Sequence, residues 1–207
     1  MHVIKGKATW AKVHEPDTRY VPEGVFSINV SVPEAESSAL CEQLEGVLKE
    51  YADKLVKEQP KLKATLSIRN PFETEYDDDG NKTGDVLFKP KMKALITTRD
   101  GKQYPRTVAV VDAKRNPIDK TTLIGNGSVV KAAFEVAPYY VAAQKVAGLT
   151  LRLKAVQVLE LKEFGNNSAT SLFEEEDGFV AKAVEKDNST DVFDDGDAVV
   201  SDDEGDF

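Results

Sequence analysis

The amino-acid sequence predicts a mainly β protein, in which a small β-barrel with one long helix precedes a disordered acidic tail. Residues 1–163 contain roughly seven short segments of strand character and one amphipathic helix, without the regular strand–helix alternation that builds a parallel sheet. Residues 164–207 contain only isolated apolar side chains among Asp, Glu, Gly, Ser and Asn. Such a segment cannot bury enough surface to offset the entropy of ordering it.

The first part of the body is expected to hold two strands, a helix and a third strand. Residues 3–13 and 25–32 have strand character, and the second segment alternates large apolar with smaller or polar side chains. Residues 34–58 contain no proline and place apolar side chains three and four residues apart, which is typical of a helix lying on a core. Residues 62–69 are expected to form another short strand.

The middle of the body reads as strands joined by polar turns. Residues 70–85 are rich in Asp, Gly and Asn, which predicts an exposed loop or a hairpin tip. Residues 86–98 and 102–113 flank the Arg-Asp-Gly sequence at 99–101, which is a strong signal for a β-hairpin.

The last part is expected to contain two further strands, at residues 128–136 and 149–162, with a linker or short helix at 137–148. The sequence Gly-Asn-Gly-Ser at 125–128 is the nearest approach to a phosphate-binding loop. It lacks the required lysine and precedes a strand rather than a helix, so a simple turn is predicted.

The chain offers little for catalysis or for a bound metal. Its single cysteine, Cys41, permits no internal disulfide, and two histidines, His2 and His14, provide no ligand cluster for zinc. The acidic run at residues 73–79 lacks the Gly and the closing Glu of a calcium loop. No Ser/His/Asp set suited to nucleophilic catalysis is present. We therefore expect neither an enzyme nor a cofactor.

No apolar run approaches the length of a signal peptide or a membrane span. Together with the lone cysteine, this predicts a soluble protein of a reducing cytoplasm, without a membrane partner.

The net charge of −9 argues at first against a nucleic-acid partner, because Lys and Arg drive phosphate binding by displacing counterions. The charge, however, is unevenly divided. Residues 1–163 contain 25 Lys and Arg against 22 Asp and Glu, whereas residues 164–207 contain 2 against 14. The acidity of the chain lies in its tail, and the body is weakly basic.

The sequence FKPKMKALITTRDGK carries the clearest basic pattern of the body. A strand period of two places the cations Lys89, Lys91, Lys93 and Arg99 on one face. The other face receives Phe88, Met92, Ala94 and Ile96. A row of cations on a hydrophobic base suits the tracking of a phosphate backbone. An ordinary solvated strand face, which also discourages edge pairing, fits the spacing equally well.

Several aromatic residues lie beside cations, and single-strand binding needs both, because cations hold phosphates while aromatic faces stack bases. Trp10 shares its parity with Ile4 and Ala8, so a core position fits it at least as well as base stacking does. For the Tyr139–Tyr140 pair, core packing is likewise an open alternative. The further candidates for DNA binding are Lys5, Lys7, Trp10, Lys12, Lys102, Tyr104, Arg106, Tyr139, Tyr140, Arg152 and Lys154.

The tail ends on Phe207, an aromatic residue with a free carboxylate. One interpretation is a solubilising tail whose last residue is accidental. A bulky aromatic is nevertheless an odd terminus for a segment that stays solvated. An apolar anchor flanked by negative charge suits a pocket ringed by Lys or Arg on a partner protein. The flanking acidic residues are Asp202, Asp203, Glu204 and Asp206.

The basic barrel, the acidic tail and the terminal Phe together resemble the acidic-tailed single-stranded DNA-binding proteins of tailed bacteriophages. GSVVKAAFEVAPYYV (Gly127–Val141) and LTLRLKAVQVLELKEF (Leu149–Phe164) are similar to that family, and the resemblance spans most of the chain. It implies an OB-fold-like small β-barrel at 1–163, a disordered acidic C-terminal tail at 164–207, and a homodimer. It also implies sequence-nonspecific binding of single-stranded DNA in phage replication, recombination and repair, in the cytoplasm of an infected bacterial cell.

For the tail, the resemblance implies contacts with the phage DNA polymerase and helicase-primase, and competition with DNA for the basic groove. These roles are carried over only onto the acidic run and the terminal aromatic, namely Asp202, Asp203, Glu204, Asp206 and Phe207. Two other functions remain open: a phage recombination mediator that anneals strands, and an acidic interaction protein without nucleic-acid binding.

Overall fold

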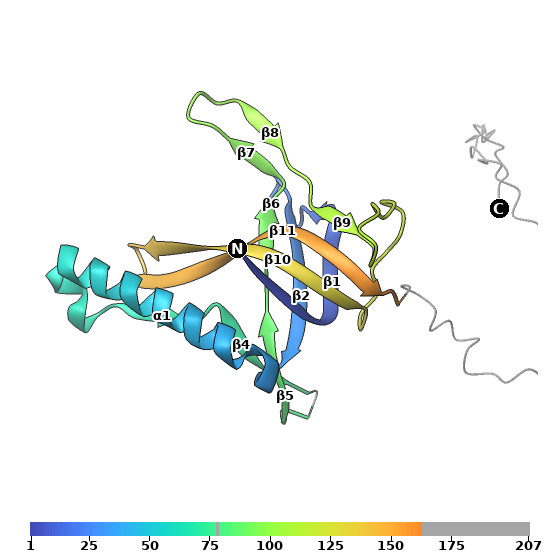
Figure 1. The fold of residues 1–207 in the computed structure, drawn as a ribbon. Coiled ribbons are helices and arrows are strands. Elements are labelled where there is room, and N and C mark those ends of the chain that lie inside the picture. Colours follow the sequence, from blue (N-terminus) through green and yellow to red (C-terminus); the bar gives the residue numbers. More distant parts are fainter. Residues whose placement is uncertain (78, 163–207) are drawn as a thin grey trace, which may run out of the picture. The chain divides into compact units, whose positions relative to one another are not determined.

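The computed structural model describes residues 1–77 and 79–162, so the tail predicted at 164–207 lies outside the described residues. One helix, α1 (Glu34–Glu58), and one 3-10 turn, η1 (Pro60–Ala64), accompany the strands (Figure 1). The strands are β1 (His2–Asp17), β2 (Val25–Pro33), β3 (Ser67–Arg69), β4 (Phe72–Tyr76), β5 (Lys82–Phe88), β6 (Lys91–Lys93), β7 (Leu95–Thr97), β8 (Gln103–Pro105), β9 (Ala109–Val111), β10 (Val129–Val141) and β11 (Val146–Glu160).

Five of these strands close a barrel. β1 pairs antiparallel with both β2 and β10, and β2 pairs antiparallel with β6. β6 runs parallel to β11, which pairs antiparallel with β10. The ring β1-β2-β6-β11-β10 therefore returns to β1, which is the Greek-key arrangement of an OB-fold. The predicted fold class, a mainly β barrel with one long helix, is confirmed.

The barrel is filled by the alternating side chains that the sequence indicated. On β2, Phe26, Ile28 and Val30 are buried, and the helix α1 covers the barrel with Leu44 and Leu48. A second, smaller cluster joins the end of the helix to the far ends of β10 and β11; its buried members are Leu55, Leu62 and Ala147. Within the described residues, no helix is long and apolar enough to cross a membrane.

The predictions of secondary structure were correct where one spacing of apolar residues extended through the whole segment. β1, β2 and α1 lie where they were expected, and the 70–85 segment forms the β4–β5 hairpin. The prediction of a strand at residues 62–69 is wrong for its first half, where Pro60 opens a 3-10 turn at the position a proline favours. Only Ser67–Arg69 is a strand.

Other predictions were wrong because pairing with distant strands divided some of the predicted strands and lengthened others. The strand expected at 86–98 divides into β5, β6 and β7, because Pro90 interrupts the ladder and the chain leaves the barrel after Ala94. The segment 102–113 likewise divides into β8 and β9. The linker or helix expected at 137–148 is instead the outer part of the long β10–β11 hairpin, whose pairing continues without a register shift from Phe134 to Val141.

Closure of the barrel depends on Gly6. A Cβ atom at this position would lie 2.1 Å from the carbonyl oxygen of Ser31, a backbone atom of β2 that cannot swing aside. We expect Gly6→Ala to lower the free energy of unfolding by about 2–3 kcal/mol, as overpacking does, and urea denaturation measures the loss. Gly46→Ala is the matched control, because nothing lies within 4 Å of its added Cβ. Wild-type stability in Gly6→Ala would show that β1 and β2 approach less closely than described.

Candidate nucleic-acid interface

Three predicted cations from three different strands form one row across the barrel. Lys12 on β1 is the cross-strand partner of Ser27 on β2, and Ser27 is the partner of Lys91 on β6. Lys91 in turn lies opposite Arg152 on β11. With strands about 4.8 Å apart, this cation row spans about 14 Å. All three cations are exposed, while Met92 and the neighbours of Arg152 along β11 are buried.

The face assignment made from the sequence holds for β6 and fails beyond it. Phe88, Met92 and Ala94 are buried, and the lysines between them are exposed. Ile96, which was expected on the buried face, is 42% exposed. It belongs to β7, which pairs only with β8 and has no barrel beneath it.

Not every predicted cation is equally available to a phosphate. The Nζ of Lys89 lies 2.5 Å from Glu73 Oε2, and the Nζ of Lys154 lies 2.8 Å from Glu135 Oε2. Hydrogen bonding from Lys154 lowers the pKa of Glu135, so this carboxylate stays ionised and keeps its partner. Lys93 is exposed and is the cross-strand partner of Val25, two residues along β6 from Lys91 in the row.

Lys5 and Lys7 occupy another part of the surface. Both are exposed on the stretch of β1 that pairs with β10. Lys5 lies directly opposite Lys131, a cation that the sequence analysis did not select. Like charges in directly opposed positions are destabilising, and an anionic partner would relieve this repulsion. The local sequence around Lys131 gave no sign of this role, because Lys131 meets Lys5 only through the pairing of β1 with β10.

Trp10 is 70% exposed, which excludes the core position that its parity suggested. The β1–β2 register shifts between Thr9 and Lys12, and Trp10 has a positive φ of 52°. This bulge turns the indole outward, as bulges re-aim side chains. The backbone N–H of Trp10 donates a hydrogen bond of 2.9 Å to Asn126 Oδ1, which holds the bulge. Trp10 therefore lies two residues from the Lys12 end of the cation row.

The β7–β8 hairpin projects away from the barrel and carries four of the predicted residues (Figure 1). These are Arg99, Lys102, Tyr104 and Arg106, the last one lying just after β8. Tyr104, 53% exposed, pairs across the hairpin with Ile96. β7 and β8 pair antiparallel on either side of the Arg-Asp-Gly turn, where Gly101 has a φ of +77°, and this pairing confirms the predicted hairpin. The hairpin forms a two-stranded sheet of its own, separate from the barrel sheet that carries the cation row, although β7 follows β6 directly along the chain.

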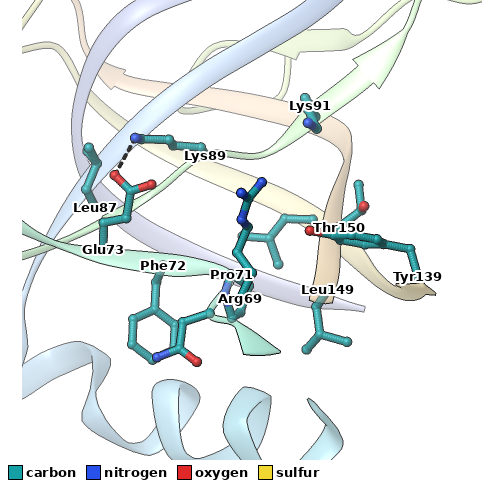
Figure 2. A pocket seen from close by; sticks show the side chains of 12 residues that line it. Arg69, Pro71, Phe72, Glu73, Leu87, Lys89, Lys91, Tyr139, Leu149 and Thr150 are labelled. Atoms are coloured by element: carbon teal, nitrogen blue, oxygen red, sulfur yellow. Dashed lines mark hydrogen bonds and ion pairs between the residues drawn. The ribbon is translucent and has the colours of Figure 1, made fainter. Parts of the chain in front are cut away.

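A groove of about 410 Å³ opens beside the row, between the β3–β4 segment and β11 (Figure 2). Lys91 belongs to both the row and the groove, and Arg69, Phe72 and Tyr139 also line the groove. The adjacent Tyr140 packs instead against the cluster at the end of α1. The sequence analysis did not select Arg69, because only the parallel pairing of β3 with β11 brings this residue to the groove.

The predicted partner-binding residues Asp202, Asp203, Glu204, Asp206 and Phe207 lie outside the described residues. Within residues 1–77 and 79–162, no group of three or more His, Cys, Asp or Glu side chains is arranged to hold a metal ion.

A five-stranded barrel with a row of exposed cations on β1, β6 and β11, which crosses the second and third ring strands, defines an OB-fold binding protein, a class whose members bind oligonucleotides and oligosaccharides on this face. Residues 5–161 match the family model described as "Single-stranded DNA-binding protein, Bacteriophage T7". The chain therefore belongs to this family, which is one of binding proteins rather than of enzymes.

Two relatives and one solved structure are similar to this chain. It is 25% identical over 173 residues to the single-stranded DNA-binding protein of Escherichia phage T7, covering 80% of this chain and 75% of the relative. The corresponding protein of Enterobacteria phage T3 is 25% identical over 165 residues, covering 76% and 71%. The crystal structure of gp2.5, a single-stranded DNA-binding protein encoded by bacteriophage T7, superposes with a TM-score of 0.66 at 24% identity, covering 87% of this chain and 99% of that one. The family resemblance inferred from the sequence is confirmed.

Proposed function

We propose that this protein binds single-stranded DNA without sequence preference during the replication, recombination and repair of phage DNA, in the cytoplasm of the infected cell. The observation that carries the proposal is the row formed by Lys12, Lys91 and Arg152 across the binding face of an OB barrel. Membership of a single-stranded DNA-binding family supports the same assignment.

The geometry suits a strand that crosses the barrel. A DNA strand laid over β1, β2, β6 and β11 would pass Lys12, Lys91 and Arg152 in turn, with Trp10 near one end and the groove beside Lys91. Cations hold phosphates, and an aromatic face stacks any base, so neither contact reads sequence. The binding that results should weaken steeply with salt, because each phosphate contact releases counterions.

The tail is proposed to recruit other proteins of the replication machinery, the phage DNA polymerase and helicase-primase. Its acidic run and terminal Phe207 are suited to a basic pocket on such a partner. Assembly of the protein as a homodimer belongs to the same proposal, on the strength of the family resemblance.

Fluorescence anisotropy of a labelled dT oligonucleotide, titrated with the full chain at 50 and 200 mM salt, tests the function. We expect tight binding at the lower concentration, clear weakening at the higher one, and no advantage for any base composition. Failure to bind at 50 mM salt would refute the proposal, and so would stronger binding to the matching duplex.

Trp10 is expected to stack on a base. It is the only tryptophan of the chain, so quenching of its fluorescence by added oligo-dT reports on this position alone. We expect Trp10→Ala to weaken binding by about 1–3 kcal/mol. Thermal stability should stay within about 0.5 kcal/mol, because the side chain is exposed. Tyr76→Ala, an exposed aromatic at the β4–β5 hairpin, is the matched control and should bind normally. A stable Trp10→Ala protein with unchanged affinity would remove Trp10 from the interface.

A further inference from the structure

The backbone at Trp10 is strained in a way that a glycine would avoid. Trp10 has a positive φ of 52°, a conformation that is unfavourable for any residue with a Cβ atom. Between Thr9 and Lys12, two residues of β1 oppose a single residue of β2. One common type of bulge places glycine at such a left-handed position. Among the described residues, Trp10 is the one non-glycine residue with a positive φ that lies inside a strand.

The backbone N–H of Trp10 finds its acceptor on the turn that leads into β10. Two residues earlier, Ala8 exchanges two backbone hydrogen bonds with this turn. Its N–H donates to the carbonyl oxygen of Ser128 at 2.8 Å, and its carbonyl oxygen accepts from the N–H of Gly127 at 2.7 Å. At Trp10 a side chain continues this ladder, because the N–H donates to Asn126 Oδ1 at 2.9 Å. Asn126 thus takes the place of a neighbouring strand where β1 bulges.

The turn that carries Asn126 is itself fixed to the chain just after β11. The backbone N–H of Gly125 donates to the carbonyl oxygen of Lys162 at 2.8 Å. Ser128 is fully buried, and its hydroxyl donates to the carbonyl oxygen of Gly125 at 2.7 Å and accepts from the N–H of Lys162 at 2.9 Å. The acceptor offered to Trp10 therefore stands on a fixed base, which a strained conformation needs in order to persist.

We infer that Asn126 is a positioning residue for the stacking indole of Trp10. Its Oδ1 holds the N–H of Trp10 in the left-handed conformation, and the bulge then points the ring away from the barrel and towards the bound strand. Asn126 acts through the backbone and needs no contact with DNA. The inference rests on the proposed function, because it explains how one of the base-stacking residues is presented to the strand.

The strain favours a functional interpretation over a purely structural one. The side chain of Trp10 is 70% exposed, so it contributes little to the core, and packing does not explain why the left-handed conformation is kept. Strained residues of this kind occur where the geometry of a ligand requires them. Without its acceptor, the ring would occupy the stacking position for a smaller fraction of the time. The apparent affinity for DNA would fall by that fraction.

Titration of a labelled dT oligonucleotide and of an abasic oligomer of the same length tests this role. Asn126→Ala removes the acceptor, and we expect it to bind the dT oligonucleotide about 2- to 10-fold more weakly than wild type, which is the equivalent of one hydrogen bond. Binding of the abasic oligomer should be unchanged, because it has no base to stack. In the Trp10→Ala background, Asn126→Ala should cause no further loss.

The fluorescence of Trp10, the single tryptophan of the chain, reports on the ring directly. In the free protein, Asn126→Ala should lower the fluorescence polarisation of the indole, because the ring moves more freely. Asn126→Asp keeps an oxygen acceptor and should preserve the wild-type polarisation, while its added charge weakens binding of both oligomers alike. Asn81→Ala is the matched control, since it removes an exposed side chain that bonds to Asp77 in the β4–β5 turn, and it should match wild type throughout.

Glycine at position 10 tests the strain independently of Asn126. Trp10→Gly and Trp10→Ala both lack the ring, but glycine adopts a positive φ without steric cost. Trp10→Gly should therefore have the higher melting temperature of the two. The opposite order would contradict a left-handed conformation at this position and overturn the inference.

The binding measurements can also overturn it. Wild-type affinity of Asn126→Ala for the dT oligonucleotide would do so, and so would equal losses on both oligomers or a further loss in the Trp10→Ala background. Each of these results leaves the proposed function standing. If Asn126→Ala fails to fold, Asn126→Asp decides, because its preference for dT over the abasic oligomer should stay at the wild-type value and not fall to that of Trp10→Ala. Failure of the wild type to bind would instead overturn the proposed function.

Discussion

Replacement of Lys12, Lys91 and Arg152 by glutamine should weaken single-strand binding for every sequence alike. Each phosphate contact to a single strand contributes about 0.7 to the slope of log K against log salt, so the triple variant should lose about 2 units of slope. The ratio of the DNA affinity of the wild type to that of the triple variant should then fall about 20-fold between 50 and 200 mM salt. Titrations at four or more salt concentrations measure both quantities.

The matched control removes the same charge from another surface. Lys49, Lys54 and Lys57 lie exposed on α1, and their triple glutamine variant should keep the wild-type slope. A folded row variant with the wild-type slope would remove the row from the phosphate path, and a flattened slope in the helix variant would show a general charge effect.

Two hypotheses for the phosphate path can be distinguished: the row across several strands seen in the structure, and a path along the segment 89–93 alone. From the sequence, Lys89, Lys91 and Lys93 formed a single cationic strand face, and their exposure agrees with it. In the structure, Lys89 is paired with Glu73. The triple glutamine variant of that strand should therefore flatten the slope less than the row variant does, because one of its three charges is already neutralised.

Local periodicity was sufficient to predict β2, α1 and the Arg-Asp-Gly hairpin, because each of these elements is decided by its own residues. The residues of the candidate site are brought together by pairing between distant segments. Lys12 reaches the row through a bulge in β1, and Arg152 reaches it through the parallel pairing of β6 with β11. Neither feature leaves a trace in the local spacing of apolar residues.

Trp10 and the segment 137–148 show the two ways in which local patterns misled. Alternation placed Trp10 among inward residues, but the bulge after Thr9 reverses the alternation and turns the indole outward. The alanine-rich segment 137–148 has the composition of a linker or helix, but both of its halves continue a ladder already formed by β10 and β11. Long-range strand pairing decided both outcomes, as is usual for β propensity.

Removal of Ser189–Phe207 is expected to tighten DNA binding, most clearly at low salt. This segment contains eight Asp and Glu and no Lys or Arg, and it is covalently attached to a body with a net charge of +3. A tethered competitor of the basic face acts at roughly millimolar effective concentration, so its loss should raise affinity by up to about tenfold at low ionic strength. Screening should remove most of the difference by 200 mM salt. Equal affinity of the truncated and full chains from low to high salt would contradict competition.

A single substitution separates competition from recruitment. Phe207→Ala removes no side-chain charge, so DNA affinity should be unchanged, whereas association with the phage DNA polymerase should weaken by about 2 kcal/mol or more through loss of the buried anchor. Phe193→Ala is the matched control, since it removes the same ring from another acidic stretch of the tail and should leave both interactions intact. Surface-immobilised polymerase measures the protein contact, and oligonucleotide anisotropy measures DNA affinity. Because DNA is far more densely charged than the tail, it should displace the tail from the basic face and strengthen polymerase association. If Phe207→Ala binds the polymerase like wild type, recruitment rests on the acidic run alone.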